Sequence, residues 1–272
     1  MSRRPFAKRS QSSRSCYTVL AALGQGSGAF TVDIADVDPS ASEYRGANGR
    51  PDTNKVQEAA VKLLGEKMSP EALKNYDAVI FNCTTGDLPI PDMDAFLNWI
   101  RSGKGFVGIH AATDTFRNHT PPHAYIQMIG GEFKQHGPQV EVDVINQDPV
   151  FPSTKHYPPT FKVYDEIYQM QNFDRSKVHG LLTLDKHPND KTPGDYPVSW
   201  CKLFGQGRVF YTSLGHREDV WDPTWKDPRA RTAADERKDD PKVAQDFQKQ
   251  LLGGINWALG LQPADATPQR VQ

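Results

Sequence analysis

A short, continuous apolar run at residues 106–109 is the strongest pattern along the chain. It follows Gly105 and includes Gly108, and its β-forming and small residues predict a strand that is buried on both faces of a parallel sheet. The run leads into His110, and Ala111 and Ala112 then allow a sharp turn into a helix. Such a strand holds the next side chain above the carboxyl edge of the sheet, where ligands bind in open α/β sheets. His110 is therefore the first candidate for chemistry.

The stretch before this strand predicts the crossover that feeds it. Residues 77–82 form a second apolar run, and residues 91–101 carry apolar side chains at helical spacing. A strand, a helix and a strand in this order predict a right-handed connection between two parallel neighbours.

The other periodicities extend this unit into one large α/β domain. Helices are expected over 16–23, 54–68, 122–129 and 247–259, with a helix restart at 69–71, and strands over 30–34, 140–145, 161–170 and 179–184. Residues 198–204 and 208–213 flank Gly205-Gln206-Gly207, which predicts a hairpin and hence an antiparallel extension of the sheet. We find no repeat and no dividing linker, so residues 16–260 are expected to form one domain between a basic tail (1–15) and a polar tail (261–272).

Composition excludes several classes of protein. The net charge of −1 gives no nucleic-acid footprint, and no apolar run approaches the roughly 20 residues of a membrane span. Three widely spaced cysteines predict neither a disulfide framework nor a zinc knuckle, so a cytoplasmic, reducing compartment is expected. Residues 1–15 are basic and serine-rich without an apolar core, which favours a disordered tail over a transit peptide.

Three histidines follow apolar segments: His110, His136 and His216. An imidazole titrates near neutral pH and can act as an acid, a base or a metal ligand, although a satisfied, partly buried histidine is the alternative for each. Asp114 lies four residues after His110, and on an α-helix this spacing would let its carboxylate orient the ring. A local cap or salt bridge explains Asp114 equally well.

His216 is followed by Arg217 and Glu218, which resembles a base beside the carboxylate that orients it, although charged surface turns share this pattern. Glu166 and Tyr168 lie in a predicted strand and point either to solvent or into a site.

The loop after the strand at 77–82 carries Thr84, Thr85 and Asp87, which could bind a polar ligand or only form a turn. No G-x-G-x-x-G follows a strand and no P-loop lysine is present, so no cofactor is expected. Cys83 follows a buried strand without a histidine nearby in sequence, and is interpreted as a core thiol.

Several of these segments together resemble one known family. They are residues 76–82 (YDAVIFN) with 84–87 (TTGD), 105–114, 130–133 (GGEF) with His136, 165–168 (DEIY) and 211–216 (YTSLGH). In this order, over roughly residues 16–260, they resemble the ThuA family of trehalose-utilisation-like proteins, within the class I glutamine amidotransferase-like superfamily. The resemblance implies a flavodoxin-like, three-layer α/β/α sandwich with a mostly parallel sheet. In that superfamily a cysteine stands at the turn that His110 occupies here, so the chain is not expected to be a glutamine amidotransferase.

The resemblance also implies chemistry on trehalose or a related disaccharide, through 3-keto sugar intermediates. His110 with Asp114, and His216 with Glu218, are then the expected catalytic acid/base pairs. The expected substrate-binding residues are Thr84, Thr85, Asp87, His136, Glu166, Tyr168 and Arg217. A carbohydrate is the expected partner, without nucleic acid or membrane, and a homo-oligomer is left open.

Two alternatives stay open at this stage. One is a carbohydrate-binding or scaffold protein that has lost its chemistry. The other is a divalent-metal-dependent hydrolase that uses His110, His136 and His216 as ligands, although their spacing is not a known zinc signature.

The family normally begins with an apolar strand and a glycine-containing loop that contributes to the site. Residues 5–15 are basic and serine-rich instead. The first central strand is therefore expected to be missing from this sequence.

Overall fold

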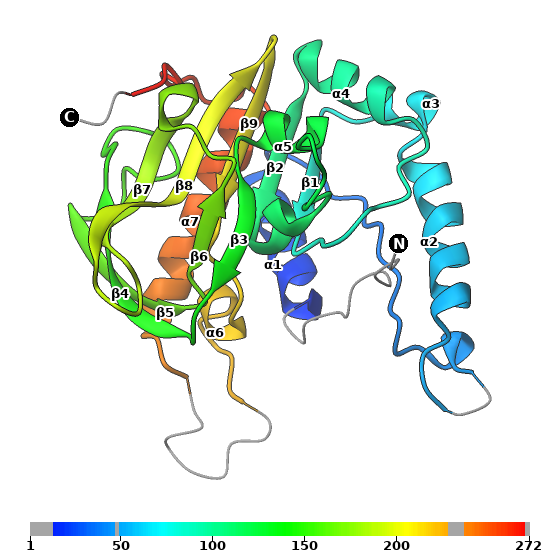
Figure 1. Ribbon diagram of the computed structural model, residues 1–272, viewed down its shortest axis with the longest axis horizontal. Coiled ribbons are helices and arrows are strands. Elements are labelled where there is room, and N and C mark those ends of the chain that lie inside the picture. The colour runs from blue at the N-terminus through cyan, green and yellow to red at the C-terminus, as the bar shows by residue number, and fades with distance from the viewer. Residues whose placement is uncertain (1–12, 47–48, 228–236, 270–272) are drawn as a thin grey trace.

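The computed structural model describes residues 13–46, 49–227 and 237–269, so the predicted basic tail lies mostly outside the described residues. A seven-stranded sheet forms its centre (Figure 1). The strands, in spatial order, are β1 (Ala78–Asn82), β2 (Gly105–Ile109), β9 (Gly207–Thr212), β8 (Pro193–Phe204), β7 (His179–Lys186), β4 (Val140–Asn146) and β5 (Thr160–Asp165). β1, β2 and β9 are parallel, and the remaining neighbours pair antiparallel.

The flavodoxin-like α/β class is confirmed, and the predicted hairpin joins β8 to β9. The antiparallel extension makes up more of the sheet than the sequence indicated. β1 forms an edge of the sheet, and within the described residues no strand precedes it. Its side chains are mostly half-buried, so the interpretation of residues 77–82 as a buried strand is wrong except at Phe81.

Alternate side chains of the parallel strands enter two separate apolar clusters, one on each face. Phe106 of β2 and Tyr211 of β9 lie in a cluster with α4 (Met93–Arg101) and α5 (Ala124–Ile129). Their sequence neighbours, Val107 in β2 and Phe210 in β9, pack with α7 (Pro241–Ala258) on the opposite face (Figure 1). This alternation is the period-2 pattern of a strand covered on both sides.

Side chains cap the starts of four helices, and a glycine ends a fifth. Asp52, Ser69, Asp92 and Asp240 accept backbone N–H groups at the starts of α2 (Thr53–Lys67), α3 (Pro70–Leu73), α4 and α7. Gly130, at φ 95°, ends α5 in the left-handed conformation. The shorter helices are η1 (Ser42–Tyr44), η2 (His110–Asp114), η3 (Arg175–Lys177) and α6 (Glu218–Trp221).

The N-terminal part of the described chain differs from expectation. The helix α1 (Ser13–Ser27) continues past Gly24, and no strand forms at residues 30–34. The alternation of apolar and polar residues was misleading, because this segment pairs with no strand among the described residues. Asp33 instead accepts hydrogen bonds from the side chains of Lys67 and Tyr76. Figure 1 shows α2 standing beyond the edge of the sheet, next to α3.

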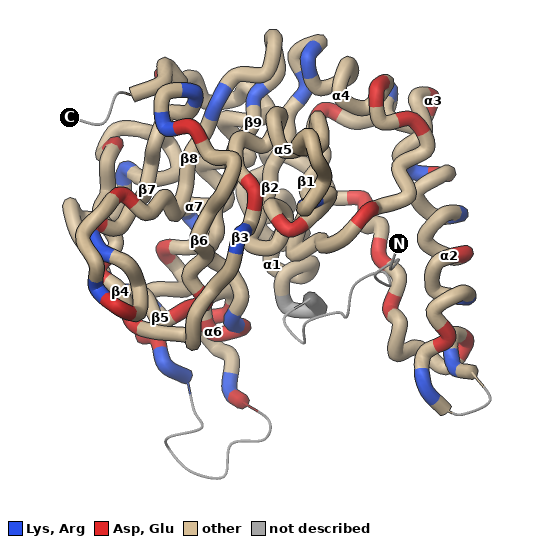
Figure 2. Tube along the Cα trace, viewed as in Figure 1, with Lys and Arg blue, Asp and Glu red and all other residues tan. Residues whose placement is uncertain are grey.

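A second, two-stranded sheet of β3 (Glu132–His136) and β6 (Tyr168–Gln171) lies close to the carboxyl end of β2. The single strand expected over 161–170 is thus two strands, and Glu166 lies between them. Figure 2 shows basic and acidic positions interspersed along the trace. Across the described part of the chain, no helix combines the length and apolar character that a membrane span needs.

Candidate active site

His110 lies at the carboxyl end of β2 in a left-handed backbone conformation, with φ at 49°. A histidine rarely adopts this conformation, so the surrounding structure must hold it there. The hydroxyl of Tyr211 does so, because it donates a 2.8 Å hydrogen bond to the His110 carbonyl oxygen and lies 2.9 Å from the Thr113 hydroxyl. The result is a sharp elbow that presents one imidazole above the edge of the sheet.

The protonation pattern of the His110 ring follows from its partners. Nδ1 lies 2.8 Å from the carbonyl oxygen of Ser213, and a carbonyl can only accept, so Nδ1 carries the proton. In the neutral ring, Nε2 therefore presents a lone pair. The hydroxyl of Tyr168 lies 3.0 Å from Nε2 and can donate to it. Burial raises the pKa of Tyr168 well above its usual range and Glu166 adds to this effect, so the phenol stays neutral.

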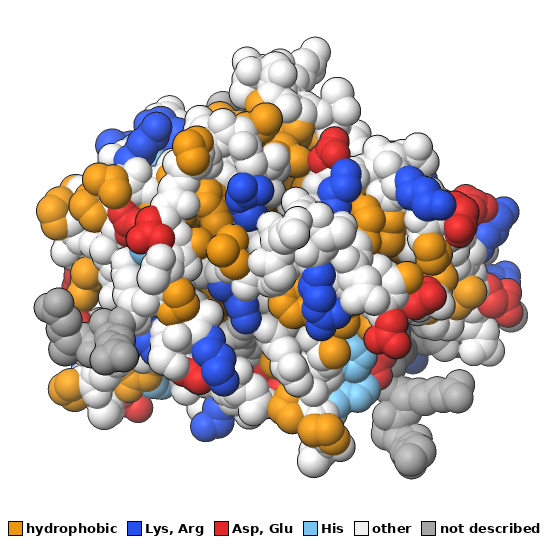
Figure 3. Space-filling model, turned by 90° about the horizontal axis from the view of Figure 1, so that it is seen from above, with side chains coloured by type: hydrophobic (Ala, Val, Ile, Leu, Met, Phe, Trp, Pro, Cys, Tyr) orange, Lys and Arg blue, Asp and Glu red, His pale blue; other side chains and the backbone are white. Residues whose placement is uncertain are grey.

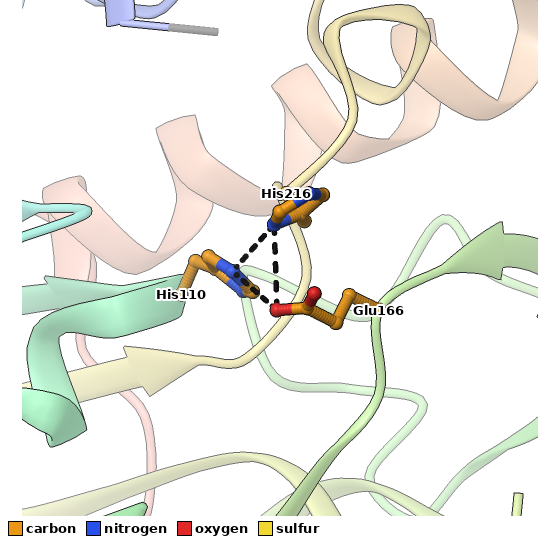
Figure 4. Close-up of side chains that lie close together, drawn as sticks. All are labelled: His110, Glu166 and His216. Atoms are coloured by element: carbon orange, nitrogen blue, oxygen red, sulfur yellow. Dashed lines mark hydrogen bonds and ion pairs between the residues drawn. The ribbon is translucent and has the colours of Figure 1, made fainter. Parts of the chain in front are cut away.

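Three side chains from distant parts of the chain converge at this point (Figure 4). Nε2 of His110 lies 3.2 Å from Nδ1 of His216, and each of these nitrogens lies 3.4 Å from Oε2 of Glu166. His216 comes from the segment after β9, and Glu166 from the connection between β5 and β6. We refer to His110, Glu166 and His216 as the central cluster.

The side chains of the central cluster shift the pKa values of one another. Burial alone would raise the pKa of Glu166, but the adjacent imidazoles of His110 and His216 outweigh it, and the pKa is lowered. Burial, reinforced by the neighbouring His110, lowers the pKa of His216. The two directions favour an ionised Glu166 beside an unprotonated His216 at neutral pH.

His136 and Asp165 support the central cluster from two sides. Nδ1 of His136 lies 3.3 Å from Oε1 of Glu166, the oxygen that does not face the two imidazoles. The buried carboxylate of Asp165 accepts the backbone N–H groups of Gly215 at 2.7 Å and His216 at 3.3 Å. Asp165 thereby fixes the loop that carries His216 and acts as a positioning residue.

Two of the expected catalytic carboxylates lie elsewhere. Asp114 forms an ion pair with Arg117, 2.5 Å away, and the Ser213 carbonyl holds the His110 ring instead. Residues 110–114 form a 3₁₀ helix with about three residues per turn. Four residues along such a helix correspond to a rotation of roughly 120°, so Asp114 does not lie on the same face as His110. Expecting an α-helix here was wrong.

Glu218 is replaced by Glu166 as the carboxylate beside His216. Glu218 is the first residue of α6 and belongs to this helix, whereas His216 lies in the segment before it. Arg217 turns toward Asp219, with Nε 2.8 Å from Oδ1, and toward Gln139.

The loop after β1 makes contacts of its own. The Thr84 hydroxyl lies 2.7 Å from that of Thr115, and Asp87 lies 3.0 Å from Nε2 of His119. Thr85 lies between Thr84 and Asp87 in the sequence. The described contacts of these three residues include none with the central cluster. Their expected role in substrate binding stays a prediction.

Three positioning groups were not singled out from the sequence: Tyr211, the Ser213 carbonyl and Asp165. Tyr211 and Ser213 belong to the YTSLGH segment that carries the family resemblance, but a buried tyrosine and a backbone carbonyl indicate no role by themselves. Asp165 gave a weak signal, since an acid at the end of a strand needs hydrogen-bond donors if it is buried.

Comparisons with known proteins agree with this fold. The ThuA family model, described as trehalose utilisation, matches residues 9–232, so the chain belongs to the ThuA family. A ThuA-like protein from Bacteroides uniformis has 24% identity and a TM-score of 0.58, covering 93% of this chain and 86% of its own. One from Parabacteroides merdae has 18% identity and a TM-score of 0.59, covering 98% and 93%. At these identities the two structures show the shared fold. A search among curated proteins finds no match.

Proposed function

We propose that this protein is an enzyme that performs acid/base chemistry on a disaccharide, or on its 3-keto form, at the central cluster. The observation that carries the proposal is the convergence of His110, Glu166 and His216 within 3.4 Å of one another at the carboxyl edge of the sheet. The family description, trehalose utilisation, supports a sugar as the substrate class.

The reaction we favour is a proton transfer next to the sugar carbonyl. Glu166, through the carboxylate oxygen Oε1 that faces away from the two imidazoles, takes a proton from the carbon beside the carbonyl, and the C–H electron pair forms the enolate. The neutral Tyr168 hydroxyl donates a hydrogen bond to the carbonyl oxygen, where the negative charge develops. The glycosidic oxygen on the next carbon, which is β to the carbonyl, then leaves with the electron pair of its C–O bond and takes up the proton that Glu166 removed. The products are an unsaturated keto sugar and a free sugar. No redox partner is consumed.

The site geometry suits these roles. Glu166 is 8% exposed and His110 3% exposed, so both stand at the floor of the site, whereas His216 and His136 are partly open to solvent. A buried carboxylate beside a neutral imidazole provides two proton-transfer groups in different surroundings, as enolisation requires. Three thiols without a disulfide among the described residues support a reducing compartment, the cytoplasm in our proposal.

The test is a product assay on trehalose and 3-keto-trehalose with the wild type, His216→Gln and the control His119→Gln. His119 also faces a carboxylate, Asp87, but belongs to an exposed pair outside the central cluster. Turnover of the keto sugar should fall about 10²–10⁴-fold in His216→Gln and stay unchanged in His119→Gln. Equal turnover in all three proteins would refute the proposed site.

A further inference from the structure

The distances within the central cluster match a tetrahedral metal centre. A zinc ion lies about 2.0–2.1 Å from nitrogen and oxygen ligands, and tetrahedral angles then place the ligand atoms roughly 3.3–3.4 Å apart. The three distances here are 3.2, 3.4 and 3.4 Å. An octahedral ion at about 2.1 Å would require roughly 3.0 Å between adjacent ligands.

We propose that Nε2 of His110, Nδ1 of His216 and Oε2 of Glu166 bind one zinc-type divalent ion. Two imidazoles and one carboxylate leave the fourth tetrahedral position free for a water or a substrate oxygen, which is the pattern of catalytic rather than structural zinc. Within the described residues, these side chains form the group of histidines and acids whose ligand atoms converge closely enough to hold an ion. The sequence alternative of His110, His136 and His216 is thereby changed in one ligand, with Glu166 in the place of His136.

The tautomer of His110 is independent support. The Ser213 carbonyl takes the Nδ1 proton, so the lone pair of Nε2 points toward the other two ligands. Histidine ligands of metals commonly donate their second N–H to a backbone carbonyl or a carboxylate, which fixes the ring. Nδ1 of His136 lies 2.8 Å from the Gly137 carbonyl oxygen and 3.3 Å from the outer oxygen of Glu166, so this ring stands beside the carboxylate ligand.

The hydroxyl of Tyr168 lies 3.0 Å from His110 Nε2, and so stands beside the proposed ion. It is placed to donate a hydrogen bond to an oxygen in the fourth position. This part of the inference rests on the proposed function, because it assigns that oxygen to the sugar carbonyl, whereas the ligand set rests on geometry alone.

The direct test is calorimetric titration of the chelator-treated full chain with Zn²⁺. We expect one ion per chain, with affinity roughly 100-fold weaker or more in Glu166→Gln and His216→Gln, and about 10–100-fold weaker in His136→Gln. His119→Gln is the matched control and should bind like the wild type. Binding that is equal in the wild type and both ligand variants, or that is lost in His119→Gln, would overturn the inference.

A second readout needs no variant and so does not depend on how the variants fold. X-ray absorption of the zinc-loaded wild type should show nitrogen and oxygen ligands only, including two imidazoles. The Co²⁺-loaded protein should show the intense visible bands of a tetrahedral site. A sulfur ligand, which would point to Cys83, or an octahedral spectrum would contradict the proposed centre.

The two proposals fail separately. Stoichiometric zinc on these three ligands without sugar turnover would leave the metal site standing and remove the proposed function. Sugar turnover at the central cluster by protein that binds no zinc would do the reverse.

Discussion

Nδ1 of His110 lies 2.8 Å from the carbonyl oxygen of Ser213, so a backbone group just beyond β9 decides which nitrogen of the catalytic candidate faces the site. A backbone carbonyl can only accept a hydrogen bond, and it fixes the ring without adding a charge. This relationship leaves Glu166 as the negative charge that the two imidazoles share.

The backbone at His110 gives the first prediction. At a φ of 49°, asparagine is tolerated and a β-branched residue is not. His110→Asn should therefore be more stable than His110→Val by about 1–2 kcal/mol in urea unfolding, although both lose activity. Equal midpoints and slopes would show that the elbow relaxes when the imidazole is removed.

The second prediction concerns Asp165. Its buried carboxylate accepts N–H groups from the segment that carries His216, and an amide accepts fewer hydrogen bonds. Asp165→Asn should cost about 1–3 kcal/mol in urea unfolding. Asp77→Asn, which changes an exposed partner of Lys104, is the control and should cost less than about 1 kcal/mol. A cost for Asp165→Asn no larger than the control would contradict its positioning role.

Asp239 makes stability depend on pH. Burial raises its pKa to about 7, and the charges of Asp219 and Asp165 add to this against the hydrogen bond from the Tyr164 N–H. The folded chain thus keeps a proton that the unfolded chain releases from about pH 4 upward. The stability that this proton contributes is full below about pH 4 and is lost as the pH rises through 7.

Asp239→Asn should therefore be more stable than the wild type at pH 8, on the order of 1–2 kcal/mol after solvent screening, and equal to it near pH 4. Urea unfolding at the two pH values measures both. A difference that is the same at pH 4 and pH 8 would assign the effect to packing rather than to ionisation.

The hydroxyl of Tyr168 can be removed without changing the ring. Tyr168→Phe should lower kcat on a keto sugar about 10–100-fold and change KM less, because the hydrogen bond strengthens as charge develops on the carbonyl oxygen. Tyr76→Phe removes a hydroxyl bonded to Asp33 at the surface and should leave kcat unchanged. A rise in KM alone would make Tyr168 a substrate-binding residue only.

Local patterns sufficed for some parts of the site. The apolar run before His110 and the hairpin before His216 were each predicted as strands that end in a histidine, and the structure pairs these strands, β2 and β9, in parallel. Parallel strands end at the same edge, so the proximity of the two histidines follows once this pairing is known.

Other parts depended on long-range packing. Glu166 reaches the cluster because β6 leaves the main sheet and pairs with β3, which no local periodicity indicates. Residues 110–114 form a 3₁₀ helix, which keeps Asp114 away from the face that bears His110. The same short sequence is compatible with an α-helical turn, so the sequence could not decide between the two. Alternation at residues 30–34 failed because a strand also needs a neighbour with unpaired backbone groups.

Figure 3 shows histidine side chains together at the surface beside acidic ones, so a histidine near an acid does not by itself mark a site. What distinguishes the central cluster is the burial of Glu166 and His110 and the convergence of three ligand atoms.

The most direct measurement of the central claim is hydrogen exchange into the substrate. In D₂O, the wild type should place deuterium on the carbon beside the carbonyl of a 3-keto disaccharide, and Glu166→Gln should lose at least about 100-fold of this exchange rate, with His119→Gln unchanged. Exchange that continues at the wild-type rate in Glu166→Gln, or keto sugar recovered from the wild-type reaction without deuterium at that carbon, would contradict proton transfer at His110, Glu166 and His216.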